Sequence, residues 1–190
     1  MIPSWSMAGV LPPIRPGTLG HDADRSPYIV TLSAIVDQFA LTDARVKILM
    51  GLLQYRDALH QIGVVSGFQW LDGSFMEDIE TLESRPPKDI DVVTYLELPL
   101  GHTQASLWAV AGDLFKNSYV KKEYSVDAYP QVLGGSLSAQ AIKRVSYWYS
   151  MWSHRRNGTW KGFVQVDLNP AEDTAAASAL AMAITGGSTP

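Results

Sequence analysis

Asp89 and Asp91 are the residues whose type and spacing most directly suggest chemistry. They alternate with Ile90 and Val92 in a strand-like run, and side chains two residues apart on a strand point to the same face. Two carboxylates held side by side repel each other unless a cation lies between them. Because Asp is depleted in strands, this pattern argues against two solvated carboxylates at a strand edge. It predicts a site for a hard cation, Mg²⁺ or Mn²⁺, which carboxylate oxygens suit.

Gly73-Ser74 follows the apolar and aromatic run 64–71 as a turn of small residues. A strand that ends in Gly-Ser and opens a helix leaves backbone N–H groups without partners, and the helix end adds partial positive charge. Alone, such a turn is most often an ordinary capped turn. With the Asp pair downstream, it predicts a phosphate-binding turn. Lys88 comes just before the pair, and its sequence fits a phosphate contact and a solvated lysine equally well.

These segments together resemble the signature of the polymerase-β-like nucleotidyltransferase superfamily. That signature is an apolar residue, Gly-Ser, a spacer, and then Asp-apolar-Asp-apolar, here Leu71, Gly73-Ser74 and Asp89-Ile90-Asp91-Val92. Asp72 stands where an apolar residue is more usual, and the spacer 75–88 is slightly longer than is typical. From GVLPPIRPG near the start to KGFVQVDL near the end, the wider sequence looks like a prokaryotic branch of that superfamily.

The resemblance implies metal-dependent transfer of a nucleoside monophosphate from a nucleoside triphosphate to an acceptor hydroxyl on RNA, protein or a small molecule. It also implies a third carboxylate from a neighbouring strand, for which Asp127 and Asp167 are the candidates. Asp127 lies mid-strand between apolar neighbours, whereas Asp167 precedes Asn169-Pro170, where Asp is a routine turn residue. We therefore predict that Asp127 joins the metal site and acts on the attacking hydroxyl, as general base or through the metal.

Two other functions stay open. One is a catalytically inactive protein of the same fold that binds a nucleotide or a protein, which becomes the better interpretation if Asp127 is not beside the pair. The other is a toxin–antitoxin-type interaction protein, with its helices as the working surface and a cognate partner protein. A basic cluster could bind phosphates or a base near Trp152 and Trp160, although a helix end with favourable charges is the commoner explanation. The cluster consists of Arg144, His154, Arg155, Arg156 and Lys161.

The composition of the chain limits the class of protein and the kinds of site and partner that it can have. The chain has 190 residues, 46% of them hydrophobic and 18% charged, which is an ordinary globular balance. It has no cysteine, so disulfides and thiolate metal sites are excluded. The net charge of −4 gives no global attraction for nucleic acid. No apolar run is long enough for a bilayer, and the start lacks a signal-peptide pattern, so we expect a cytoplasmic protein without membrane contact.

The pattern of elements predicts an α/β (α+β) fold, a small mixed twisted sheet with helices packed on it. We expect one nucleotidyltransferase-like domain over 1–170, with an extended arm at 1–25 and an Ala-rich, mobile tail at 171–190. Strands are predicted at 64–71, from Asp89 to about Leu96, at 121–132 and at 163–168. Helices are predicted from Ser26-Pro27, from Thr42 to Gly63, at 75–82, from Gly101 or Thr103, and after Gly134-Gly135 with Ser136 or Ser138 as the cap.

Overall fold

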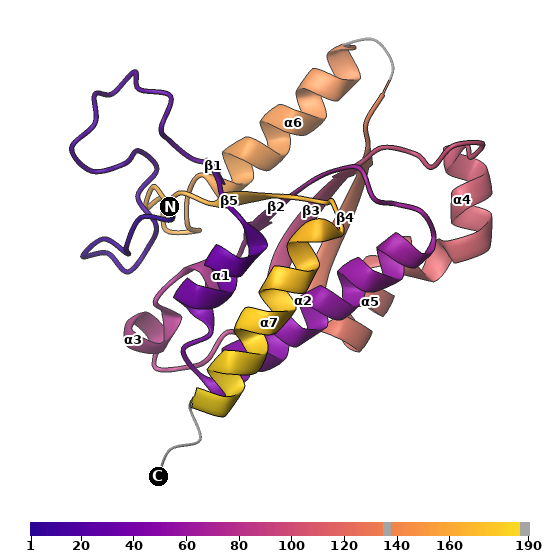
Figure 1. Ribbon diagram of the computed structural model, residues 1–190. Coiled ribbons are helices and arrows are strands. Elements are labelled where there is room, and N and C mark those ends of the chain that lie inside the picture. Colours follow the sequence, from indigo (N-terminus) through magenta and orange to yellow (C-terminus); the bar gives the residue numbers. More distant parts are fainter. Residues whose placement is uncertain (135–137, 187–190) are drawn as a thin grey trace.

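The computed structural model describes residues 1–134 and 138–186, and it confirms a mixed α/β fold (Figure 1). Five strands form one sheet in the order β1-β5-β2-β3-β4. Strands β2 and β3 are antiparallel, whereas β3 and β4 are parallel. The strands are β1 (Tyr28–Ile29), β2 (Gly67–Asp72), β3 (Ile90–Leu96), β4 (Val126–Val132) and β5 (Val164–Asp167).

Several helices begin at side-chain caps of the kind that the sequence indicates. Thr42 accepts a hydrogen bond from the backbone N–H of Arg45, Thr103 accepts one from Ser106, and Ser138 accepts one from Ala141. None of the helices in the described part of the chain is long and apolar enough to cross a membrane. The helices are α1 (Leu32–Phe39), α2 (Asp43–Gln61), α3 (Ile79–Glu83), α4 (Gln104–Ala111), α5 (Asn117–Tyr124), α6 (Ala139–Trp152) and α7 (Ala171–Gly186), with the 3-10 turns η1 (Ser74–Met76) and η2 (Gly112–Phe115).

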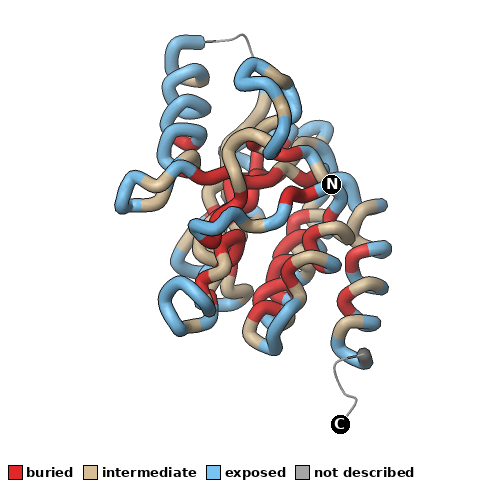
Figure 2. The backbone as a smooth tube through the Cα atoms, turned by 90° about the vertical axis from the view of Figure 1, so that its left-hand side faces the viewer, coloured by how far each residue is buried: buried red, intermediate tan, exposed pale blue. Residues whose placement is uncertain are grey.

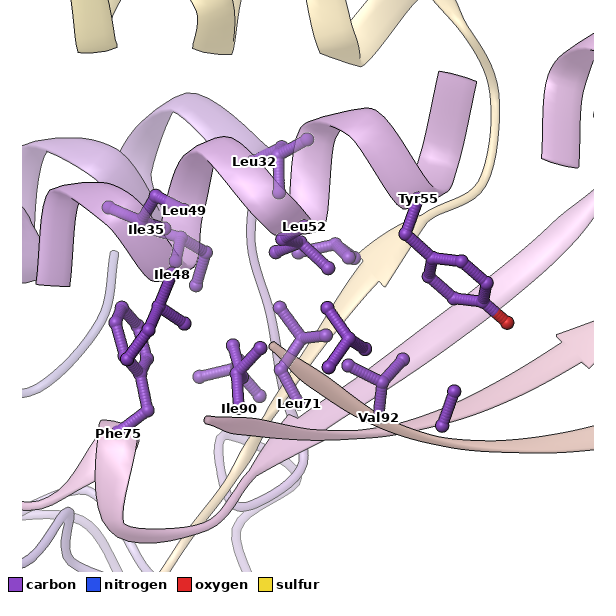
Figure 3. Packing of buried hydrophobic residues seen from close by; sticks show 14 of the residues in the cluster. Leu32, Ile35, Ile48, Leu49, Leu52, Tyr55, Leu71, Phe75, Ile90 and Val92 are labelled. Atoms are coloured by element: carbon purple, nitrogen blue, oxygen red, sulfur yellow. The ribbon is translucent and has the colours of Figure 1, made fainter. Parts of the chain in front are cut away.

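The two faces of the sheet carry different cores. Leu71 and Val92 point to the face covered by α1 and α2, where they join a large, mainly aliphatic core (Figure 3). Their neighbours Trp70 and Val93 point to the opposite face and pack in a smaller aromatic cluster that includes Trp152 at the end of α6. The first half of α6 lies beyond this cluster and is largely exposed (Figure 2). Since Asp91 lies two residues before Val93 on β3, it belongs to the aromatic face.

Three boundaries differ from the sequence predictions. Ser26-Pro27 does not start a helix: its peptide bond is cis, β1 follows, and Thr31 caps α1 instead. The strand predicted at 121–132 begins only at Val126, because 117–124 form α5, whose buried Val120 packs in the main core. The helix predicted at 75–82 is split into η1 and α3 by extended backbone at Glu77. Of the predicted turn and cap, Gly135 and Ser136 lie outside the described residues.

The predicted tail contains a packed helix. Over 171–186 the chain forms α7, which lies along α1 and α2 (Figure 1) and buries Ala176 and Leu180 in the main core. Asp173 of α7 also receives two hydrogen bonds from the fully buried guanidinium of Arg56, with N···O distances of 2.8 and 2.6 Å. The Ala-rich segment therefore completes the core over these residues. Residues 187–190 lie outside the described part of the chain.

Candidate functional site

A polar pocket of about 790 Å³ lies where β2, β3 and β4 meet on the aromatic side of the sheet. Five of the six predicted site residues line it together: Gly73, Ser74, Asp89, Asp91 and Asp127. The sixth, Lys88, is exposed and is not among the lining residues. The structure thus joins the Gly-Ser turn to the three predicted carboxylates and leaves Lys88 outside.

Three carboxylates stand in register across three adjacent strands. Asp72 of β2 is paired with Asp91 of β3, and Asp91 is paired with Asp127 of β4. Directly opposed residues on neighbouring strands share a face, with Cβ atoms only about 5 Å apart. Asp89 lies two residues before Asp91 and completes the cluster. Asp167, the alternative third carboxylate, instead accepts a hydrogen bond from the Asn169 backbone at 2.7 Å, as the turn residue that its sequence context indicates.

Position 73 requires glycine, because the turn there lies against the side chain of Asp91. Its φ is +86°, a left-handed conformation that glycine adopts without strain. A Cβ at this position would lie 2.7 Å from Asp91 Oδ2, closer than real side-chain carbons come. Ser74 then opens η1, which is a single 3-10 turn of three residues rather than the helix that we predicted. The turn therefore offers close backbone approach to the carboxylates, without the aligned dipoles of a long helix.

Lys121, on the last turn of α5, bridges two of the predicted metal ligands. Its Nζ lies 2.9 Å from Asp89 Oδ2 and 2.5 Å from Asp127 Oδ2. Asn117 donates a hydrogen bond to the other oxygen of Asp127. Burial alone would raise the pKa of Asp127, but the hydrogen bonds from Lys121 and Asn117 outweigh it and the pKa is lowered. The two carboxylates raise the pKa of Lys121 in turn.

Lys161 is a second bridging lysine, and it is buried. Its Nζ lies 3.0 Å from Asp72 Oδ1 and 3.0 Å from Glu77 Oε1. Burial would lower the pKa of Lys161, yet the two facing carboxylates outweigh it and the pKa is raised. Arg155 Nε contacts the second oxygen of Glu77 at 2.9 Å, and Arg155 Nη2 reaches Glu83 Oε1 at 2.6 Å. These pairs fix the wall of the pocket that lies beside the Gly73 turn.

Asp91 is the carboxylate without a cation of its own. In the described ranges, 1–134 and 138–186, it forms no ion pair, and it faces Asp72, Asp89 and Asp127. Burial, followed by repulsion from these three neighbours, raises the pKa of Asp91 to about 7. Burial also raises the pKa of Asp72, to about 6, although Lys161 opposes this. The centre of the pocket therefore holds a carboxyl group that ionises near neutral pH.

The donor set suits a hard divalent cation, but lysine occupies part of the site. Carboxylate oxygens of Asp89, Asp91 and Asp127 are ligands of the kind that Mg²⁺ and Mn²⁺ take. Even so, no group of three or more His, Cys, Asp or Glu side chains among the described residues is arranged to hold a metal ion. The ammonium of Lys121 lies between Asp89 and Asp127 instead.

Part of the predicted basic cluster lines the same pocket. His154, Arg155, Arg156 and Lys161 are lining residues, together with Trp152, whereas Arg144 and Trp160 are not. The pocket thus has an acidic floor and a basic wall, which suits an anionic ligand that brings a metal cation. Sequence reasoning missed Lys121, Glu77 and the role of Asp72. The one available signal was Asp72 itself, an acidic residue at a position where the resemblance implies an apolar one.

The chain belongs to a family described as a family of unknown function (DUF6932), whose sequence model matches residues 3–167. No curated protein and no solved structure matches the chain.

Proposed function

We propose that this protein is a Mg²⁺- or Mn²⁺-dependent nucleotidyltransferase that moves a nucleoside monophosphate from a nucleoside triphosphate to an acceptor hydroxyl. The observation that carries the proposal is the row of carboxylates in the pocket. Asp91 and Asp127 are in register on neighbouring strands, Asp89 lies beside them, and the Gly73 turn closes on Asp91. Lys121 compensates Asp89 and Asp127 only, and Asp91 is buried against them without a cation, which is costly and supports a site kept for binding a cationic ligand.

Each residue has a role that follows from its position. Asp89 and Asp91 would hold the metal ion, which supplies charge stabilisation to the triphosphate when it is bound. Asp127, on the adjacent strand, would bring the acceptor hydroxyl to the same place and accept or orient its proton. The turn at Gly73 and Ser74 lets backbone atoms approach the phosphates closely. His154 and Arg156 are exposed on the basic wall, where they would contact the anionic substrate.

The acceptor is the open part of the proposal. RNA, protein and small-molecule hydroxyls all remain candidates, and a cytoplasmic location, which we propose, would supply nucleoside triphosphates. Incubation with α-³²P-labelled ATP, GTP, CTP and UTP, in the presence of Mg²⁺ or Mn²⁺ and mixed cellular RNA or protein, tests for label transfer and identifies the acceptor class. Absence of transfer to every acceptor, from a protein that binds the nucleotides, would contradict the enzyme proposal.

Asp127→Ala separates catalysis from binding. We expect nucleotide affinity by titration calorimetry to stay nearly unchanged, because Gly73, Asp89 and Asp91 remain. The single-turnover rate of label transfer should fall by a factor of about 10² or more, as loss of a positioned base commonly does. Asp167→Ala is the matched control, because it removes the other candidate aspartate outside the pocket and should leave the rate unchanged. Equal loss of binding and turnover in Asp127→Ala would contradict the assigned role.

A second candidate is a metal-free protein of the same fold that binds a nucleotide or a cognate partner protein, as in toxin–antitoxin systems. The observation in its favour is that the ammonium of Lys121 already bridges Asp89 and Asp127. Calorimetry with ATP and GTP, each with Mg²⁺ and with a chelator, distinguishes the two. Affinity that is independent of Mg²⁺, with no label transfer, would favour this second candidate.

A further inference from the structure

We propose that Lys121 is a built-in competitor for the divalent cation, which keeps the pocket metal-free until a polyphosphate ligand draws the lysine away. This inference rests on the proposed function, because it concerns regulation of the same pocket. It predicts that metal and polyphosphate bind cooperatively, and that metal alone binds weakly to the natural protein.

Lys121 holds oxygen atoms that a metal ion would need. Its Nζ contacts Oδ2 of Asp89 and Oδ2 of Asp127, while Asn117 donates to Oδ1 of Asp127. Both oxygens of Asp127 are therefore engaged by protein donors, and one oxygen of Asp89 is engaged as well. The ammonium lies between Asp89 Oδ2 and Asp127 Oδ2, so a metal ion that bridged these two oxygens would meet its charge and volume and would have to displace it. Ammonium and metal are thus alternatives at the same two oxygens.

Lys121 is the displaceable cation of the pocket. Its side chain is 46% exposed, whereas the side chain of Lys161 is 7% exposed and lies between Asp72 and Glu77. Withdrawal of Lys161 would leave two buried carboxylates without their cation, which is costly. Withdrawal of Lys121 moves a flexible, solvated side chain by rotation about its own bonds. Because Lys121 also lines the pocket, a phosphate group that enters offers it a new anionic partner.

The charge left behind favours a dication. When Lys121 withdraws, Asp89 and Asp127 lose their cationic contact and join Asp91, which forms no ion pair in the described part of the chain. Three neighbouring carboxylates then face one another, and the remaining lysine, Lys161, is engaged with Asp72 and Glu77. A dication relieves this repulsion better than a single ammonium does. Permanent removal of the ammonium should therefore raise the affinity for metal even in the absence of a nucleotide.

The test measures Mn²⁺ binding to the full chain without nucleotide, by titration calorimetry and by the electron paramagnetic resonance signal of free Mn²⁺. Lys121→Met removes the ammonium and keeps much of the side-chain volume. We expect it to bind Mn²⁺ at least tenfold more tightly than the natural protein does. Lys122→Met is the matched control, because it removes a neighbouring charge on the same turn of α5, outside the pocket, and should change the affinity less than twofold.

A second measurement adds inorganic triphosphate to the natural protein. Triphosphate should raise its Mn²⁺ affinity beyond that of triphosphate alone, and this gain should shrink in Lys121→Met. Lys121→Gln serves as the replacement variant if circular dichroism shows that Lys121→Met is not folded. Unchanged or weaker Mn²⁺ binding in the folded variants would overturn the inference.

The outcomes separate this inference from the proposed function. Tighter Mn²⁺ binding by Lys121→Met, without label transfer by any form, would support the competition and contradict the enzyme. Label transfer by the natural protein, with equal Mn²⁺ affinity in both forms, would support the enzyme and overturn the competition.

Discussion

Lys161 and Lys121 make almost the same contacts at opposite sides of one pocket. Lys161 bridges Asp72 and Glu77 at 3.0 and 3.0 Å, and Lys121 bridges Asp89 and Asp127 at 2.9 and 2.5 Å. They differ in burial, since the side chain of Lys161 is 7% exposed and that of Lys121 is 46% exposed. Contacts of similar geometry therefore do not mean equal energies. A buried pair is costly to break on one side, whereas an exposed pair contributes little to stability.

The comparison divides the pocket into a fixed part and an exchangeable part. On the Lys161 side, the chain supplies a permanent cation, and Arg155 shares the carboxylate of Glu77. On the Lys121 side, the cation can be replaced by solvent or by a ligand. Asp91 lies between the two sides and forms no contact ion pair within the described ranges. This division gives stability effects of different size for otherwise similar substitutions.

Removal of Lys161 should have the largest effect. Lys161→Met leaves Asp72 buried without its cation, and we expect a loss of about 3–5 kcal/mol in the free energy of unfolding, as for other broken buried pairs. Urea denaturation at pH 7.5 measures it. The double variant with Asp72→Asn should recover part of the loss, because it removes the charge that was left unpaired. A loss below about 1 kcal/mol would show that Lys161 is no more fixed than an exposed lysine.

Asp91→Asn should have an intermediate effect that depends on pH. The pKa of Asp91 is raised from 3.8 to about 7, so the folded state binds a proton more tightly than the unfolded state does. Ionisation of Asp91 therefore lowers the stability of the natural protein as pH rises from about 4 to about 7. In a chelating buffer, the free energy of unfolding of Asp91→Asn should exceed that of the natural protein by roughly 2–4 kcal/mol at pH 8 and by much less at pH 4. The reason is that a shift of one pKa unit corresponds to about 1.4 kcal/mol.

The informative quantity is how the stability difference between Asp91→Asn and the natural protein changes with pH. Thermal melts of both proteins between pH 4 and pH 8 measure it, and comparison of the two cancels the contributions of other titrating groups. The groups that face Asp91 are Asp72, Asp89, Asp127 and, at longer range, Lys161. A difference that stays constant across this range would show that Asp91 ionises at its ordinary pKa, and the central carboxylate would not be crowded.

Lys121→Met should change stability least. The side chain of Lys121 is 46% exposed, whereas those of Asp89 and Asp127 are 22% and 14% exposed, so losing this contact should cost more than losing a surface pair and less than losing a buried one. We expect the free energy of unfolding to fall by roughly 1–2 kcal/mol in low salt and by less in 0.5 M NaCl, where screening weakens both the pair and the repulsion left behind. Urea denaturation at the two salt concentrations provides the measurement. A loss as large as that of Lys161→Met would remove the distinction between the two lysines.

The sequence predicted three carboxylates of the acidic floor and four members of the basic cluster that line the pocket, but it did not predict Lys121. Asp89 and Asp91 could be found because strand alternation brings them to one face, and Asp127 because the resemblance implies a third carboxylate from a neighbouring strand. Lys121 could not be found, because 121–132 looked like one strand, whereas residues 117–124 form a helix. Because of that error, the sequence did not reveal that Lys121 lies on α5 and lines the pocket. Lys88 is the converse case: it was predicted as a site residue because it directly precedes Asp89, but it does not line the pocket.

In the overall fold, likewise, local features could be predicted from the sequence and long-range contacts could not. Caps at Thr42 and Thr103 were predictable because a side-chain oxygen satisfies a backbone N–H within three residues, which is a local interaction. β1 and the packing of α7 were not, because they depend on partners more than a hundred residues away, such as Val164 for Tyr28 and Arg56 for Asp173. Long-range pairs of this kind leave no periodic pattern in the sequence.

The position of β5 has a consequence for synthesis on the ribosome. In space, β5 lies between β1 and β2, yet it is made after the other four strands of the described sheet. A growing chain that has already formed the β2–β3 pair therefore displays the other edge of β2, with Gln69 and Leu71 without their β5 partners, until residues 164–167 emerge. Open strand edges attract other chains. The nascent protein is thus most vulnerable to aggregation in the interval before residues 164–167 emerge, after which this short strand and α7 close the sheet and the core together.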